Sequence, residues 1–186
     1  MSDRILWRRL DVPGHEIADV RRVENAWRLI GTSVFAHDQR PCKLDYVITC
    51  NDSWWTTAAS VTGVAGDLEV DLHIAVDAKR RWRANGAECP AVEGCLDIDL
   101  EFTPSTNLLP IRRLGLAVGE DATVKAAWLS FPSLNFELLL QVYRRERERT
   151  YRFESGGGAF VRLLEVNAAG FVTSYPGLWQ AESAPS

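Results

Sequence analysis

Three carboxylates occupy alternate positions of one short segment, Asp97, Asp99 and Glu101, with apolar residues between them. This alternation is typical of a β-strand, in which residues i and i+2 share a face and lie about 6 to 7 Å apart. Two carboxylates at that separation suit a small hydrolase or isomerase, one as acid and one as base. The pattern is equally typical of a solvated strand face, and Arg112 and Arg113 follow closely enough to pair with it. We therefore predict no catalytic residue.

The cysteines and histidines show none of the spacings that metal sites require. Four cysteines are present without a CxxC pair, and their separations match no common zinc knuckle. Neither a GxSxG elbow nor a glycine-rich phosphate loop occurs. We expect no metal, no cofactor and four reduced thiols. Because the first residues lack the apolar run of a signal peptide, we expect a cytoplasmic protein.

Charge and hydropathy bear on two classes of partner. The formal net charge of −4 gives nucleic acid no general attraction. A local basic cluster is interrupted by two glutamates and lies between two apolar runs, which indicates a solvated hairpin end; it consists of Arg144, Arg145, Arg147 and Arg149. No stretch approaches the ~20 apolar residues of a membrane span. We predict no nucleic-acid partner and no integral membrane protein, and the oligomeric state stays open.

The elements that carry these residues are predicted to be strands. Leu68–Val76 and Leu96–Phe102 alternate apolar with polar side chains. Further strands are predicted over Leu44–Cys50, Trp54–Val64, Val124–Phe131, Phe136–Tyr143 and Phe160–Val166. Roughly ten strands with one buried face each must curl into a barrel, a roll or a two-sheet sandwich. We predict one mainly β, antiparallel domain over residues 1–186, with the residues after about 180 frayed.

Seven tryptophans stand out in a chain of this length. Their amphipathic rings suit the wall of a lipid cavity or a sugar-stacking surface, and they also serve as ordinary core residues. Trp54 and Trp55 are adjacent, so in a strand one faces the core or a cavity and the other faces outward.

A proline-rich segment follows the acidic strand and carries a family resemblance. Pro104 and Pro110 bracket residues that lie outside a regular sheet, because proline cannot donate a ladder hydrogen bond. The stretch from Gly94 to Leu114 resembles the signature of the putative glycolipid-binding family, a bacterial family first described as a domain of unknown function. The resemblance extends over most of the chain, through Tyr46 and Trp54, Trp82, Phe131-Pro132, Gln141 and Tyr143, and Gly170-Phe171-Val172.

The resemblance implies a spiral β-roll or half-barrel, similar to bacterial carriers of lipoprotein acyl chains or glycolipids. It implies non-enzymatic binding of an amphipathic ligand, a glycolipid or a fatty-acyl compound, in a cavity of the roll. Two alternatives stay open: an enzyme that uses the carboxylates of the Asp97 strand, and a scaffold that binds another protein through a sheet face. The candidate ligand-binding residues are Trp54, Trp82, Asn107, Arg112, Arg113 and Trp128.

Arg112 and Arg113 have two competing interpretations. They bind the polar head of a ligand at the mouth of the cavity, or they neutralise the acidic strand. If the segment is extended, consecutive side chains point to opposite sides, so only one arginine meets the carboxylates. A short helix around Leu108–Leu116 is the alternative that would remove this geometric premise.

Overall fold

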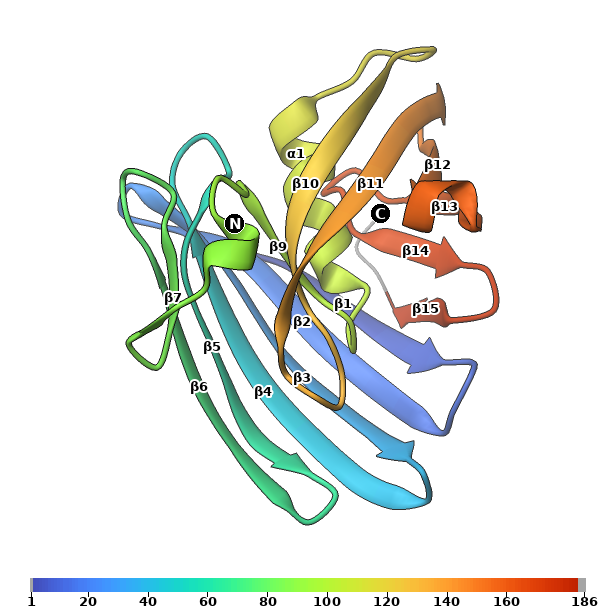
Figure 1. Cartoon of the computed structure of the whole chain (residues 1–186). Helices are drawn as coiled ribbons and strands as arrows, with labels where there is room; N and C mark the ends of the chain where they lie inside the picture. The colour runs from blue at the N-terminus through green and yellow to red at the C-terminus, as the bar shows by residue number, and fades with distance from the viewer. Residues whose placement is uncertain (1, 184–186) are drawn as a thin grey trace.

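The alternating segments form fifteen strands of one open sheet in a computed structural model that describes residues 2–183 (Figure 1). The strands are β1 (Ser2–Arg9), β2 (Gly14–Val23), β3 (Ala26–His37), β4 (Arg40–Cys50), β5 (Thr56–Ala65), β6 (Leu68–Val76), β7 (Trp82–Ala84), β8 (Ala87–Glu88), β9 (Asp97–Leu100), β10 (Asp121–Leu129), β11 (Phe136–Arg147), β12 (Thr150–Ser155), β13 (Phe160–Val166), β14 (Val172–Tyr175) and β15 (Trp179–Ser183). Helical turns are few: α1 (Leu108–Leu114) and the 3-10 turns η1 (Pro90–Val92), η2 (Ser105–Asn107) and η3 (Gly156–Gly158).

The sheet is built outward from its middle in two directions. Strands β1 to β8 pair antiparallel in sequence order until β8 forms one edge. The chain then crosses to the opposite edge, where β9 pairs parallel with β10, and returns through antiparallel neighbours to β15. Strand β15 pairs with β1, so the first and last strands lie side by side. The indole nitrogen of Trp7 donates to the Val172 carbonyl oxygen at 2.6 Å across this join.

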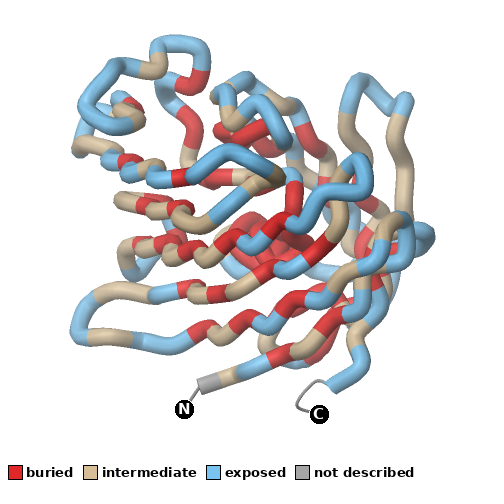
Figure 2. Tube along the Cα trace, turned by 90° about the horizontal axis from the view of Figure 1, so that it is seen from below, coloured by how far each residue is buried: buried red, intermediate tan, exposed pale blue. Residues whose placement is uncertain are grey.

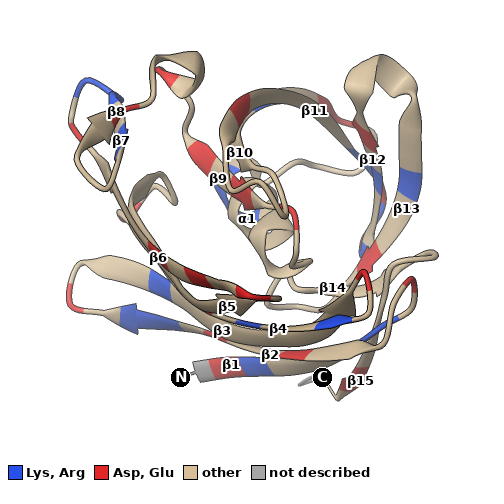
Figure 3. Ribbon diagram, turned by 60° about the horizontal axis from the view of Figure 1, so that its bottom comes forward, with Lys and Arg blue, Asp and Glu red and all other residues tan. Residues whose placement is uncertain are grey.

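The sheet curls into a roll because its strands bury one face each. Every second residue of β4 from Cys42 to Cys50 is buried, and the residues between them are not. Figure 2 shows this alternation along neighbouring strands. Strands β1 to β6 form one wall and β10 to β14 the other, with α1 between them (Figures 1 and 3). The predicted mainly antiparallel β-roll is confirmed.

The interior of the roll is filled by the proline-rich segment itself. Residues 102–111 are all buried, and Leu108 and Leu109 are 0% exposed. Pro110 is tolerated in α1 because it lies in the first turn, where backbone N–H groups have no intrahelical partner. Gly115 ends the helix in the left-handed region, with φ of 55°, and its N–H bonds to Ile111. The space of the expected cavity is therefore occupied by residues 102–111. We call residues 102–116, which continue from there to the rim of the roll, the interior segment.

Two predicted segments differ from the observed strands. Trp54 has a φ of 64° and lies in a turn before β5, where the Asn51 side chain accepts hydrogen bonds from Ser53 and Trp55. The pair still divides as predicted, since Trp54 is 9% exposed and Trp55 39% exposed. At the other end of the chain, residues up to Ser183 extend β15, and residues 184–186 lie outside the described part.

Candidate functional site

The prediction of a solvated face for the acidic strand is wrong at Asp97, which is buried, whereas Asp99 is half-buried and Glu101 is exposed. Strand β9 lies beside α1, so the helix reaches the buried end of the acidic row (Figure 3). Asp97 is 1% exposed and is held by Arg113, whose Nη2 lies 2.6 Å from Asp97 Oδ2 and whose Nε donates to both oxygens at 3.0 and 3.1 Å. Burial raises the pKa of Asp97, while Arg113 opposes the shift. This carboxylate is therefore one half of a buried ion pair.

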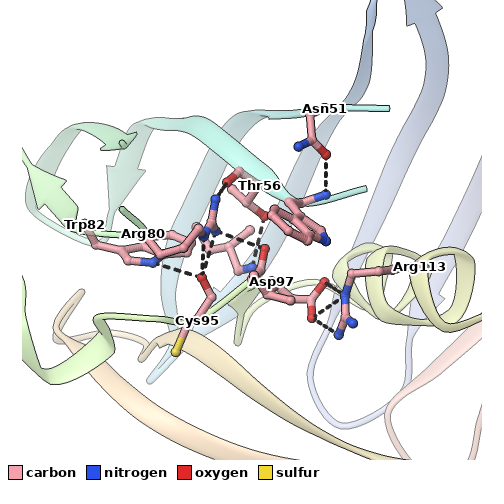
Figure 4. A network of polar contacts seen from close by, with 10 residues as sticks. Asn51, Thr56, Arg80, Trp82, Cys95, Asp97 and Arg113 are labelled. Carbon is pink, nitrogen blue, oxygen red and sulfur yellow. Dashed lines mark hydrogen bonds and ion pairs between the residues drawn. The ribbon is translucent and has the colours of Figure 1, made fainter. Parts of the chain in front are cut away.

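A network around Arg80 fixes the crossing that leads into β9 (Figure 4). The Arg80 guanidinium donates to the Cys95 carbonyl oxygen at 2.7 and 3.1 Å and to the Thr56 carbonyl oxygen at 2.8 Å. Trp82 donates its indole N–H to the same Cys95 oxygen at 3.2 Å and is 1% exposed. Trp82 is therefore a core residue, and Arg113 forms an ion pair with the buried Asp97.

Arg112 lies apart from the acidic strand. Its guanidinium sits 5.2 Å from the Trp54 ring centroid and 6.0 Å from that of Trp27, and the two indoles stack at 4.5 Å. Consecutive residues of a helix point about 100° apart, so α1 separates Arg112 from Arg113 even though the segment is not extended. The helix removes the extended geometry on which the prediction of a single arginine at the carboxylates rested; within residues 2–183 Arg113 pairs with Asp97, and Arg112 forms no ion pair with the acidic strand.

A cleft of about 340 Å³ opens between the interior segment and the C-terminal strands. We call it the aromatic cleft. Its apolar lining comes from six strands, β10 to β15, or the turns beside them, and consists of Trp128, Leu139, Phe153, Phe160, Tyr175, Leu178 and Trp179. Its polar lining consists of Asp99, Glu101, Thr103, Asn107 and Ser155. The parallel pairing of β9 with β10 sets Trp128 opposite Asp99 in register.

The polar groups of the aromatic cleft are held in place before any ligand binds. Gln141 donates its amide N–H to Asp99 Oδ2 at 2.5 Å, and the Tyr143 hydroxyl donates to Asn107 Oδ1 at 2.8 Å. Glu101 Oε2 accepts the Phe131 backbone N–H at 2.7 Å. Burial raises the pKa of Asp99 to about 6, and the neighbouring Glu101 and Asp97 charges act in the same direction. The cleft thus combines oriented oxygens with aromatic walls.

A further buried carboxylate, Glu16, ties the interior segment to the opposite wall. The Tyr46 hydroxyl donates to Glu16 Oε1 at 2.6 Å and lies 2.6 Å from Ser105 Oγ, and the Thr103 hydroxyl also donates to Glu16. Tyr46 on β4 reaches Glu16 on β2 across Gly31, where an added Cβ would lie 2.2 Å from the tyrosine hydroxyl. Burial raises the pKa of Glu16 to about 7. Sequence analysis gave no indication of this network.

The six candidate residues fall into three places. Asn107 and Trp128 line the aromatic cleft, Arg112 packs on the Trp54 indole, and Trp82 and Arg113 belong to the core contacts described above. The sequence analysis missed the C-terminal part of the cleft, because Phe153, Tyr175 and Trp179 follow the same alternation as core residues. The three come from separate strands, so no local spacing relates them.

All four cysteines lie in the described part of the chain and are free. Burial raises the pKa of Cys50 to about 12 and that of Cys95 to about 11, so neither forms a reactive thiolate near neutral pH. Titration with a thiol reagent is expected to count four thiols in urea. In the native protein the half-buried Cys89 should react first, and fewer than four thiols after unfolding would contradict a fully reduced protein.

Residues 2–183 contain neither a metal-binding cluster nor a membrane-spanning helix. No group of three or more His, Cys, Asp or Glu side chains is arranged there to hold a metal ion. Within the same residues, no helix has the length and apolar character needed to cross a membrane.

The open roll, its filled interior and the aromatic cleft define a β-roll protein with a cleft at one side of its core. The chain belongs to the family described as putative glycolipid-binding, whose profile matches residues 4–181. A crystal structure of a DUF1089 family protein from Pseudomonas aeruginosa is similar in fold, with a TM-score of 0.76 and 32% sequence identity. The match covers 89% of this chain and 91% of that chain. No curated protein matches the sequence.

Proposed function

We propose that the protein binds an amphipathic glycolipid, without chemical change, by holding the sugar head group in the aromatic cleft. This proposal rests on the combination of aromatic walls with Asp99 and Asn107 side-chain oxygens that hydrogen bonds already hold in position. Flat rings pack on the apolar faces of a sugar, and a carboxylate or amide bonds to its hydroxyl groups. The description of the family as glycolipid-binding supports the same ligand class.

The size of the cleft favours the head group over the lipid chains. About 340 Å³ is near the lower end of the range of about 300 to 1,000 Å³ for small-molecule pockets. The interior segment occupies the space that acyl chains would need inside the roll. We infer that the acyl part of the ligand stays outside the sheet while the sugar enters the cleft.

Replacing Trp128 with alanine is expected to weaken binding of octyl glucoside about tenfold or more, because the variant loses an aromatic wall of the cleft. Isothermal titration calorimetry below the micelle concentration measures this affinity. Trp55→Ala is the matched control, since Trp55 is 39% exposed and does not line the cleft. Equal affinities of the two variants would contradict the proposed site.

The raised pKa of Asp99 favours a second candidate, a glycoside hydrolase in which Asp99 acts as general acid. An acid with a pKa of about 6 is suited to proton transfer near neutral pH, and Glu101 lines the same cleft. Release of nitrophenol from nitrophenyl glycosides by the wild type, abolished in Asp99→Asn, would establish this function. Binding of octyl glucoside without turnover would establish the first.

We propose that the protein works in the cytoplasm. The proposal is supported by the four free cysteines, three of them buried, since thiols stay reduced in that compartment.

A further inference from the structure

A second pocket, also of about 340 Å³, lies where the interior segment leaves the roll. It contacts that segment at Ile111, Arg112 and Gly115, whereas the aromatic cleft contacts it at Thr103 and Asn107. The rest of its wall comes from the β11–β12 hairpin and from the turn between β13 and β14. The two sites share no lining residue.

Positive charge is in surplus in this second pocket. Arg112, Arg145 and Arg149 line it, and none of the three forms an ion pair within residues 2–183. Glu148 is the single acidic side chain among the described lining residues, and it is exposed. Arginine side chains without carboxylate partners are the usual protein ligands of oxyanions, because their planar fork matches two oxygens at once. We call this the arginine pocket.

Arg145 is fixed in position but not neutralised. Its Nε and Nη2 donate to the Glu148 carbonyl oxygen at 3.1 and 2.5 Å, and its Nη1 donates to the Leu116 carbonyl oxygen at 2.7 Å. These contacts use three of the five N–H groups of a guanidinium and leave its full charge. The guanidinium also lies 5.7 Å from the Tyr151 ring centroid. Its two remaining N–H groups are therefore available to an anion without a change in the side-chain conformation.

Asn167 supplies an independent indication of a missing acceptor. This lining residue is 8% exposed, and its Oδ1 accepts the Phe171 backbone N–H at 2.9 Å, which fixes the orientation of the amide. Its Nδ2 is buried and has no hydrogen-bond partner among the described residues. A buried donor without an acceptor is costly, so a native site of this kind calls for an acceptor that the chain does not provide.

We propose that the arginine pocket binds a phosphate group, either free or as a phosphomonoester. Three arginines against one glutamate match a doubly charged tetrahedral anion better than a single carboxylate. Gly170 keeps room for this arrangement, because an added Cβ would lie 3.3 Å from Arg112 Cδ and its φ is 94°. The inference goes beyond the proposed sugar site and does not rest on it.

Calorimetry with inorganic phosphate in low-salt buffer tests the site. Arg149→Ala is expected to weaken phosphate binding about tenfold or more, because the Arg149 side chain has no hydrogen-bond or ion-pair partner within residues 2–183 and its charge is lost from the pocket. Arg147→Ala is the matched control: it removes the same charge from the same hairpin, at an exposed position outside the lining. If the phosphate affinity falls equally in both variants, the loss is explained by net charge alone and the proposal is overturned.

Asn167→Asp provides a second test that keeps the turn. The new carboxylate still accepts the Phe171 N–H, but it replaces the unpartnered donor with a negative charge, so phosphate binding should be lost while the circular dichroism spectrum, which reports the fold, is kept. Unchanged phosphate binding in this variant would contradict the site. Octyl glucoside binding by Arg149→Ala should match the wild type, which separates a failure here from a failure of the sugar site.

Two probes distinguish the source of the phosphate. Glycerol 3-phosphate represents a soluble phosphomonoester, and phosphatidylcholine vesicles with phosphatidic acid represent a lipid head group. If the protein binds the soluble ester alone, the phosphate belongs to a free metabolite. If the protein sediments with the acidic vesicles and Arg149→Ala abolishes this sedimentation, the phosphate belongs to a lipid head group. Absence of binding to inorganic phosphate and to both probes would overturn the proposal.

Discussion

Replacing Arg113 with alanine is expected to lower the free energy of unfolding by about 3 to 5 kcal/mol. The reason is the carboxylate that would remain behind. Asp97 is 1% exposed, and Arg113, itself 15% exposed, provides the hydrogen bonds to both of its oxygens. Without that partner the buried charge must be protonated or exposed, and either change costs stability. Urea unfolding followed by tryptophan fluorescence measures the loss.

Arg112→Ala is the matched control for Arg113→Ala. Arg112 is the neighbouring residue on α1 and packs on indole rings without an ion pair in the described chain, so its removal should cost only about 0.5 to 1 kcal/mol. Adding Asp97→Asn to Arg113→Ala should recover part of the loss, because the orphaned charge is removed. Equal losses in the two arginine variants would show that the buried pair contributes nothing specific.

The stability of the wild type is expected to fall as the pH rises, owing to Glu16. The folded-state pKa of this carboxyl is about 7, above the ordinary value of 4.5, so between these values the folded protein binds more protons than the unfolded chain. Stability is therefore fully present below about pH 4.5 and is lost as the pH approaches 7 and passes it. The contribution of this one group is about 3 kcal/mol. Urea midpoints measured from pH 5 to 8 report it.

Glu16→Gln removes this titration while keeping the shape of the side chain and an oxygen for the Tyr46 and Thr103 hydroxyls. The variant should lose the decline between about pH 6 and 8. That range is diagnostic because Asp99, with a pKa of about 6, gives a decline of the same sign that is complete near pH 6. Superimposable profiles for wild type and variant would refute the role of Glu16.

The strands were predictable from sequence because alternation is a local signal. Leu68–Val76 and Phe160–Val166 coincide with β6 and β13 without a shift at either end. Each strand buries one face against the same core, so the pattern of a nine-residue window already contains the information. The resemblance then selected the roll among the three closures that the pattern allows.

The path of residues 102–116 was not predictable in the same way. Prolines showed that this segment leaves the sheet, but nothing local tells whether it passes outside the roll or through it. The path of the segment decides which face of β9 is shielded from solvent, and so whether Asp97 is solvated or buried. The aromatic cleft depends on it too, since Thr103 and Asn107 line the cleft only because the segment runs inside.

The pairing of β1 with β15 also constrains how the protein is made. Trp7 bonds to Val172 across 165 residues of sequence, and β1 has β2 as its only other neighbour in the sheet. During synthesis on a ribosome, β1 therefore keeps one unpaired edge until nearly all of the described chain has emerged. Such an edge can pair with a strand of another nascent chain. Strand β15 covers it within the same molecule and so removes this route to aggregation.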